Sequence, residues 1–306
     1  MRTSLAAGLQ FFLTHNSIFA LVGERGETGA MFRFDAHVHS VVSDGTESPA
    51  QVMEAAAHAG LDAVALTDHD TFEGLAAAHE AAERVGIELV PGVELSTKVG
   101  GVSLHMLAYY PAQGPSPLRD LMERIRQSRL LRIQEMAGRL GVDYPEVSWE
   151  ALQELGEDDK SWGRPHLADL LVGGGHFHDR AEAFQTVLHP HSPYYVRQWS
   201  PAPEDMVRAV RDAGGVPVMA HPQSNRRGKM EEETLERMVE AGLFGLERDH
   251  REHDQAARAQ IDQWARRWGL AVTGGSDYHG LGKPNRLGEN LTSEEVFAQI
   301  KREAGR

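Results

Sequence analysis

The chain of 306 residues contains no cysteine. This absence excludes disulfide bonds, thiolate zinc sites and cysteine nucleophiles, so any metal must take nitrogen and oxygen ligands. Such ligands suit manganese, iron or zinc. The absence of cysteine is also compatible with the cytoplasm, where we expect the protein to reside.

Basic residues are in short supply, because 31 Lys and Arg face 45 Asp and Glu, a formal net charge of -14. This balance argues against broad affinity for nucleic acid, and we expect no duplex DNA partner. It does not exclude a nucleotide at a local cationic site, because a cluster of divalent ions reverses the local field.

A long uninterrupted apolar run is also missing. The stretch from Leu5 to Gly23 is mostly uncharged, but polar residues between Gln10 and Ser17 interrupt it, and no Ala-x-Ala cleavage site follows. We therefore expect neither a membrane span nor a secretory signal. Residues 1–30 are interpreted as an extension that precedes the fold, which begins at Met31.

Short apolar runs typical of strands alternate with segments of helical spacing in two parts of the chain. This alternation, at intervals of about thirty residues or fewer, favours a parallel α/β architecture. Asp70 and Glu73 resemble a capping pair at the start of the second helix. The expected strands are 32–38, 63–66, 87–90, 102–109, 216–220, 245–247 and 271–273, and the expected helices are 49–60, 70–85, 203–213, 231–241 and 253–268.

The alternation stops at Pro111, Pro115 and Pro117 and resumes at Pro203. The intervening segment is rich in Arg, Leu and Glu and lacks the rhythm of strands. A chain of 33.7 kDa is large enough for one barrel-sized domain with an insertion. We predict a barrel in two parts, residues 31–112 and 201–306, separated by a helical subdomain at 113–200.

Histidines and carboxylates recur where the apolar runs end. His37 and His39 alternate on a strand, so both can reach one ion. A single His-x-His string indicates little, but the carboxyl ends of strands form the working face of a parallel barrel, and nearly all the clusters fall there. His105, inside its strand, is the exception. The pattern predicts a multinuclear hydrolytic metal site.

Four strings together resemble the motifs of the polymerase and histidinol phosphatase (PHP) superfamily of metal-dependent phosphoesterases. They are His37-x-His39, Thr67-Asp68-His69, Ala220-His221-Pro222 and Ser276-Asp277-x-His279. The resemblance runs from about Phe32 to the C-terminus. It implies an α/β fold, a distorted seven-stranded β/α barrel, with two or three divalent ions, manganese before iron or zinc.

The same resemblance implies how the ligands divide. Asp44 alone would be an ordinary turn residue, and His105 or His221 alone an ordinary strand histidine. Asp68 and Asp70 are expected to accept hydrogen bonds or cap a helix and not to bind metal. The implied ligands are His37, His39, Glu94 and Asp277 for the first ion, Glu94, His105 and His221 for the second, and Asp44, His69 and His279 for the third.

Within the superfamily, Gly163-Arg164-Pro165-His166 and Tyr195-Val196 resemble compact phosphatases with a helical insertion. These act on nucleoside 3',5'-bisphosphates, monophosphates or the 5' end of short RNA. The resemblance implies that Arg164 binds phosphate, which suits a planar guanidinium. The branch usually has a Lys where this chain has Ser192. Cations that could replace it are Arg197, Arg226, Arg227 and Lys229, and Tyr195 or Trp199 either stack a base or pack the insertion onto the barrel.

We therefore predict an enzyme, a metal-dependent phosphatase or phosphodiesterase that acts on a small nucleotide or short 5'-phosphorylated RNA. A hydroxide held between two ions is expected to attack phosphorus, with Asp68 or His250 assisting proton transfer. Two alternatives stay open. One is a histidinol-phosphate phosphatase with the same metals, and the other is a noncatalytic, metal-binding regulatory module.

Overall fold

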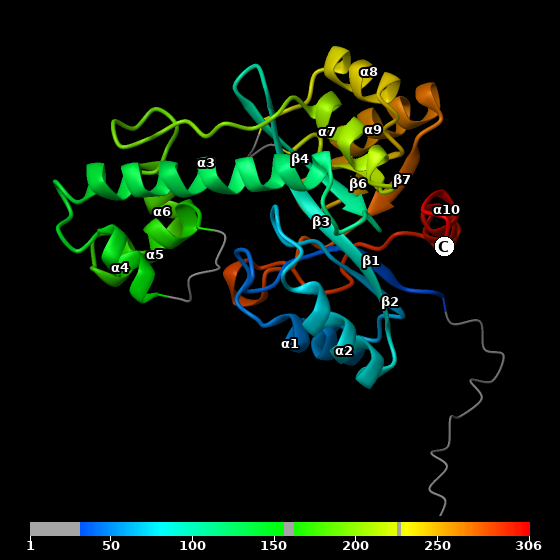
Figure 1. The fold of residues 1–306 in the computed structure, drawn as a ribbon, viewed down its shortest axis with the longest axis horizontal. Coiled ribbons are helices and arrows are strands. Elements are labelled where there is room, and N and C mark those ends of the chain that lie inside the picture. Colours follow the sequence, from blue (N-terminus) through cyan, green and yellow to red (C-terminus); the bar gives the residue numbers. More distant parts are fainter. Residues whose placement is uncertain (1–30, 156–161, 225–227) are drawn as a thin grey trace, which may run out of the picture. The chain divides into compact units, whose positions relative to one another are not determined.

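The computed structural model describes residues 31–155, 162–224 and 228–306, and residues 32–306 form one compact unit (Figure 1). The predictions for residues 1–30, Arg226 and Arg227 lie outside the described residues. Within the described ranges, none of the helices has the length and apolar character needed to cross a membrane.

Seven strands pair in the order in which they occur along the chain. Val38 at the end of the first strand also bridges Tyr278, just beyond the last one, so the sheet curls into a nearly closed barrel. The seven-stranded barrel predicted from the sequence is confirmed. The strands are β1 (Phe34–Val38), β2 (Ala63–Leu66), β3 (Glu88–Val99), β4 (Val102–Tyr109), β5 (Val216–Ala220), β6 (Gly245–Asp249) and β7 (Ala271–Gly274).

The expected parallel pairing does not extend to β4, which pairs antiparallel with both β3 and β5. Gly100 and Gly101 connect β3 to β4, with φ of 55° and 90°. A two-residue connection of this kind makes a hairpin and is too short for the crossover that parallel strands require. β3 is also longer than expected, so Glu94 lies inside a strand and not in a loop after it.

The helices outside the insertion cover the barrel with their apolar faces. Ser48 caps the first of them in a reciprocal capping box with Gln51. The last helix was not anticipated from the sequence. They are α1 (Pro49–His58), α2 (Leu75–Val85), α7 (Pro203–Asp212), α8 (Glu232–Glu240), α9 (Gln255–Trp268) and α10 (Glu294–Glu303).

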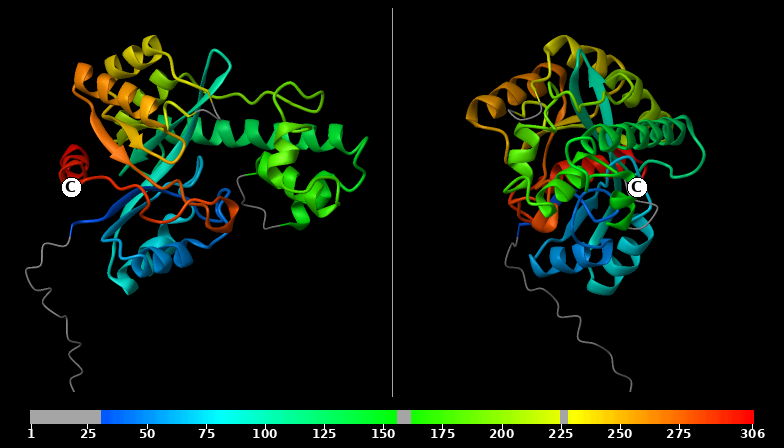
Figure 2. Two further views of the ribbon diagram at one scale, coloured as in Figure 1. Left: turned by 180° about the vertical axis from the view of Figure 1, so that it is seen from behind. Right: turned by 90° about the vertical axis from the view of Figure 1, so that its left-hand side faces the viewer.

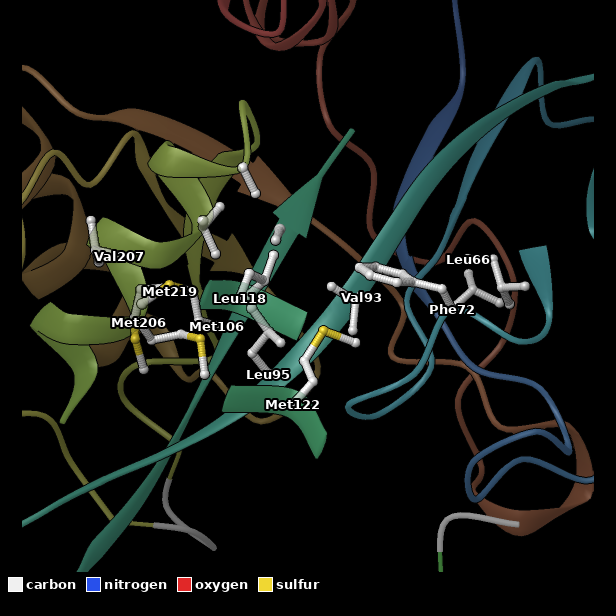
Figure 3. Packing of buried hydrophobic residues seen from close by; sticks show 14 of the residues in the cluster. Leu66, Phe72, Val93, Leu95, Met106, Leu118, Met122, Met206, Val207 and Met219 are labelled. Atoms are coloured by element: carbon white, nitrogen blue, oxygen red, sulfur yellow. The ribbon is translucent and has the colours of Figure 1, made fainter. Parts of the chain in front are cut away.

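Two apolar cores hold the barrel together. One is formed by side chains of the strands β1 to β5 and of α10. In it Phe297 of α10 packs against Phe34 at the start of β1, with ring centroids 4.8 Å apart. The other lies between the sheet and its helices. Figure 3 shows Met122 of the first insertion helix beside Val93 and Leu95 of β3. The strand ends that carry the predicted ligands are thus fixed from both sides of the sheet.

Helices occupy the segment between β4 and α7, and one of them belongs to two cores. The first half of α3 packs on the barrel through Leu118 and Ile125, whereas Met136 and Leu140 in its second half belong to a separate core. Figure 2 shows this long green helix extending from the barrel to the other insertion helices. The four helices are α3 (Pro117–Leu140), α4 (Trp149–Glu154), α5 (Arg164–Gly173) and α6 (Arg180–Gln185).

Candidate metal centre

Four of the predicted ligands, from three parts of the barrel, meet at the end of β1. His37 and His39 point to the same side because they alternate on the strand, and their Nε2 atoms lie 3.0 Å apart. Glu94 Oε2, from β3, is 3.2 Å from His37 Nε2 and 3.0 Å from His39 Nε2. Asp277 Oδ1, from the loop after β7, is 3.4 Å from His39 Nε2. One ligand atom of each residue lies within 4.8 Å of the other three, which is close enough to share an ion.

The second oxygen of Glu94 faces a different pair of imidazoles. Oε1 is 2.7 Å from His105 Nδ1 and 3.0 Å from His221 Nε2. His105 reaches this place because antiparallel pairing sets it opposite Ala220, directly before His221. Glu94 therefore presents one oxygen to each of two ligand groups, the arrangement of a bridging carboxylate.

Asp44 forms the centre of a third group. Its Oδ1 lies 3.0 Å from His279 Nε2, and its Oδ2 lies 3.9 Å from His69 Nε2. His69 Nε2 is also 3.3 Å from Glu94 Oε2. All nine ligands expected from the sequence are therefore linked into one cluster around Glu94 and Asp44.

The hydrogen bonding of this cluster fits a metal centre better than a protein network. Glu94 Oε2 is buried among the Nε2 atoms of His37, His39 and His69 at 3.0–3.3 Å. Yet among the described residues it has no partner with hydrogen-bond geometry. Lone pairs that converge on a buried carboxylate oxygen, with no hydrogen-bond donor aimed at it, are what a cation requires. An all-nitrogen-and-oxygen set of this kind suits divalent manganese, iron or zinc.

The charges of the cluster reinforce one another. Burial would raise the pKa of the Glu94 carboxyl, but the imidazoles of His69 and His105 hold that pKa well below its usual range. Burial likewise opposes a charged His37, but the carboxylates of Glu247 and Glu94 outweigh it and raise the pKa of this imidazole. The carboxylates are consequently ionised and ready to bind cations.

The cluster opens to solvent at one side. The side chains of His37, His39 and Glu94 have no exposed surface, whereas Asp44 is 22% exposed and His105 is 13% exposed. A substrate can therefore approach at the Asp44 and His105 side.

Glu247 supports two ligands and was missed in the sequence. Its Oε1 lies 3.0 Å from His37 Nδ1, and its Oε2 accepts a hydrogen bond of 2.8 Å from the backbone N–H of His221. A carboxylate on the far nitrogen of a ligand histidine fixes the orientation of the ring. The signal was present, since Glu247 ends an expected strand as the other clusters do.

Asp277 is held by two further side chains. Lys283 Nζ bonds its Oδ2 at 2.8 Å, and His250 Nε2 lies 3.4 Å from the same oxygen. His250 Nδ1 accepts the backbone N–H of Glu252, so the neutral ring carries its proton on Nε2, toward Asp277. This contact makes His250 a neighbour of a ligand. Lys283, in a polar loop, gave no signal in the sequence.

Asp68 and Asp70 each accept several hydrogen bonds. Asp68 accepts from Ser40 N–H at 2.8 Å, from its hydroxyl at 2.6 Å and from the Ser43 hydroxyl at 2.7 Å, which fixes the loop before Asp44. Asp70 accepts from the backbone and hydroxyl of Ser96 and pairs with Arg129.

The predicted capping pair Asp70 and Glu73 is wrong. The helix α2 begins at Leu75 after Gly74, with no side-chain cap. Asp70 has a left-handed φ of 52°, and its carboxylate turns to β3 instead of back to the helix.

Arg164 lies in the insertion among aromatic rings. Its Nη1 bonds the carbonyl of Leu188, and its guanidinium lies 5.1 Å from the Phe184 ring and 5.6 Å from the Tyr195 ring. The Arg132 guanidinium also lies over the Tyr195 ring, 5.0 Å from its centroid. Burial and the charge of Arg164 lower the pKa of Arg132 to about 10, which marks a concentration of positive charge.

Arg197 and Trp199 lie elsewhere, along α3. They line a groove of about 410 Å³ together with Arg124 and Arg132, and none of the nine ligands lines it. The Arg124 guanidinium covers the Trp199 ring at 3.7 Å, and the Trp199 backbone N–H bonds the Ser128 hydroxyl. These contacts favour packing of the insertion for Trp199 over stacking of a base.

Comparison with known proteins agrees with this geometry. The family model of the PHP domain matches residues 35–161. A solved structure from Bifidobacterium adolescentis, described as a metal-dependent phosphoesterase, is 38% identical, with a TM-score of 0.85 over 89% of this chain and 98% of that one. A second, from Chromobacterium violaceum, is described as an amidohydrolase with bound sulfate. It is 30% identical, with a TM-score of 0.77 over 89% and 96% of the two chains.

Curated relatives cover most of the chain. A phosphoribosyl 1,2-cyclic phosphate 1,2-diphosphodiesterase of Eggerthella lenta is 34% identical over 80% of this chain and 94% of its own. A 3',5'-nucleoside bisphosphate phosphatase of Chromobacterium violaceum is 33% identical over 84% and 90%. A 5'-3' exoribonuclease of Haemophilus influenzae is 29% identical over 85% and 94%. With this fold, this cluster and these relatives, the chain belongs to the PHP family of metal-dependent phosphoesterases.

Proposed function

We propose that this phosphoesterase hydrolyses phosphate esters of small phosphorylated ribose compounds, with a nucleoside 3',5'-bisphosphate or the 5' end of a short oligoribonucleotide as the best candidates. The carrying observation is the cluster of nine predicted ligands, in which Glu94 contacts histidines of all three ligand groups. The three curated relatives support this proposal, since they are named for activity on a phosphoribosyl cyclic phosphate, on nucleoside bisphosphates and on RNA.

The cluster is proposed to hold two or three divalent ions, with manganese or iron expected before zinc. When bound, such ions polarise phosphoryl oxygens and lower the pKa of water. The chain itself orients the ligands through Glu247 and Lys283 and excludes solvent from His37, His39 and Glu94. Arg164, beside Tyr195, supplies positive charge toward the substrate's phosphate.

A phosphate-release panel tests the substrate. It comprises a nucleoside 3',5'-bisphosphate, the matching monophosphates, a short 5'-phosphorylated RNA, a ribose 1,2-cyclic phosphate and histidinol phosphate. The expected result is the highest kcat/KM on a bisphosphate or on the RNA. The nucleotide assignment would be overturned if kcat/KM for histidinol phosphate exceeded that of every other compound by more than about tenfold, which is roughly 1.4 kcal/mol in transition-state stabilisation.

The ribose cyclic phosphate is in the panel because the Eggerthella lenta relative carries that activity in its name. This second candidate needs two successive ester cleavages at one centre. Accumulation of a ring-opened monophosphate before phosphate release would favour it over the bisphosphate. If none of the compounds releases phosphate with manganese present, the result would favour the alternative of a noncatalytic, metal-binding regulatory module.

A further inference from the structure

One arginine of the insertion is held rigidly beside the metal centre and has no part in the site described so far. Arg180 begins α6, and its Nε and Nη2 bond the two carboxylate oxygens of Asp169 on α5 at 2.6 and 2.7 Å. This two-point pair fixes the plane of the guanidinium. It leaves Nη1 outside the pair, on a side chain that is 36% exposed.

Arg180 lies next to the turn that follows a metal ligand. A short 3-10 turn, η1 (Gly280–Gly282), comes directly after His279. A Cβ atom built on Gly282 would be 3.7 Å from Arg180 Nη1 and 3.7 Å from the Cβ of His279. His279 is in turn 3.0 Å from Asp44, the most exposed of the carboxylate ligands. The arginine therefore borders the open side of the cluster.

His166 lies in the same neighbourhood and offers a hydrogen-bond donor. Its Nδ1 accepts the backbone N–H of Gly163 at 3.0 Å, so the neutral ring carries its proton on Nε2. The ring packs edge-on against Trp162, with centroids 5.1 Å apart. Burial lowers the pKa of His166 despite the carboxylates of Asp44 and Asp169.

The helix α5 places His166 beside the ion pair of the insertion. Asp169, which binds Arg180, follows His166 by three residues on this helix, so the two side chains lie on the same face. The charges of Asp44, Asp169 and Arg180 all act on His166, which agrees with this placement. A fixed guanidinium and a fixed N–H donor at one place are suited to phosphate oxygens.

We propose that Arg180 and His166 form a subsite for a second phosphate of the substrate, one that is not hydrolysed. The proposal rests on the proposed function, in which the scissile phosphate is bound by the metal ligands. Arg180 does not contact those ligands but borders them at the open side, where a second phosphate on the same ribose can reach. The subsite gives the enzyme a preference for bisphosphorylated over monophosphorylated substrates. Arg180 is a further cation of the insertion, in which Ser192 stands where related phosphatases usually have Lys.

The kinetic test compares Arg180→Met with the wild type on adenosine 3',5'-bisphosphate and on the two adenosine monophosphates. Loss of a charge-assisted contact should lower kcat/KM for the bisphosphate about ten- to hundredfold, mainly through KM. The value for the monophosphate hydrolysed best should change less than about threefold. Arg180→Lys, which keeps the charge but not the fork, should be intermediate.

Controls separate recognition from structure. Arg208→Met removes an arginine from an exposed pair with Asp205 on α7 and should leave both substrates unaffected. Equal losses on bisphosphate and monophosphates in Arg180→Met would show that the arginine only joins α5 to α6. No loss on either would equally overturn the subsite.

A binding measurement distinguishes failure of the subsite from failure of the proposed function. The metal-loaded protein is titrated calorimetrically with a bisphosphonate analogue of adenosine 3',5'-bisphosphate and, separately, with inorganic phosphate. Arg180→Met should weaken binding of the analogue about tenfold or more and leave binding of inorganic phosphate unchanged. If no ester is hydrolysed but binding of the analogue is still weakened in Arg180→Met, the proposed function fails and the subsite stands. Equal binding of the analogue by both proteins overturns the subsite even in an active enzyme.

Discussion

At the scale of single residues, the metal centre depends on side chains that serve more than one neighbour. Glu94 presents each carboxylate oxygen to a different set of imidazoles, and Glu247 holds one predicted ligand ring and the backbone of another. Removing such a residue disturbs several contacts at once, because the remaining partners stay buried without a substitute.

Glu247→Ala should weaken metal binding although Glu247 is not a proposed ligand. Loss of the carboxylate frees the His37 ring to rotate and leaves the His221 N–H without its acceptor. The expected loss in metal affinity is about 10–100-fold. Competition with a chromogenic chelator measures it, with Glu240→Ala, on the exposed face of α8, as the control. Wild-type affinity in Glu247→Ala would contradict the role given to this carboxylate, and Glu247→Gln should retain part of it.

Most of the nine expected ligands adjoin an apolar run, and strand ends of a barrel meet at one rim, so the sequence predicts that they lie together. His105, inside its strand, and Asp44, in a turn, were expected only from the family resemblance. Glu247 satisfied the same rule and was overlooked, since it stands alone without a motif. Lys283 and Arg180 could not be found, because their partners Asp277 and Asp169 are settled only by tertiary packing.

At the scale of elements, α3 connects the barrel to the insertion. Its 24 residues contribute to the barrel core through Leu118 and to the insertion core through Leu140. The helix also pairs Arg129 with Asp70, next to the ligand His69. The insertion is thereby joined to the loop that carries part of the metal centre.

Leu140→Ala should destabilise the insertion without removing the metal site. Leu140 is fully buried, and a cavity in this core costs about 2–5 kcal/mol. Leu131→Ala, on the same helix, removes the same atoms from a side chain that is 66% exposed and should change stability by no more than about 0.5 kcal/mol. Urea unfolding and metal content measure both effects. Similar stability losses in the two variants would contradict the separate core assigned to the insertion.

Arg129→Met should destabilise the protein by about 3–5 kcal/mol, because it leaves the buried Asp70 without its cation. The double variant Arg129→Met with Asp70→Asn should recover part of this loss. Arg119, on the same helix as Arg129, pairs with Glu73, and both side chains are about half exposed. Arg119→Met should therefore cost about 1 kcal/mol or less. Equal effects of the two arginine variants in urea unfolding would refute the importance of burial here.

Most strands and helices were predictable, since their apolar periodicity is local. The direction of β4 was not, because the parallel rule assumes a crossover, whereas Gly100 and Gly101 allow a direct reversal. That reversal has a functional consequence, since antiparallel pairing brings His105 beside Ala220 and so toward His221.

At the scale of the whole molecule, a net charge of -14 coexists with a centre that attracts cations. Asp44, Glu94 and Asp277 contribute three carboxylates to a largely buried cluster, together with six imidazoles. Three bound dications would leave about three formal positive charges there, which favours a phosphate dianion in a protein that repels polyanions elsewhere.

Removal of metal should therefore lower both activity and thermal stability, and added manganese should restore both. Ions that bind only the folded state stabilise it by about 2.7 kcal/mol at a hundredfold excess over Kd. Calorimetric Tm values before and after chelation, with elemental analysis of each sample, measure the effect. His37→Ala removes a predicted ligand of the first group. The Tm of this variant should respond less to manganese than the Tm of the wild type, and most of the activity should be lost. An unchanged Tm in wild-type protein shown to be free of metal would mean that the nine side chains hold one another without ions. The cluster would then be a hydrogen-bonded core, contrary to the convergence of lone pairs seen at Glu94.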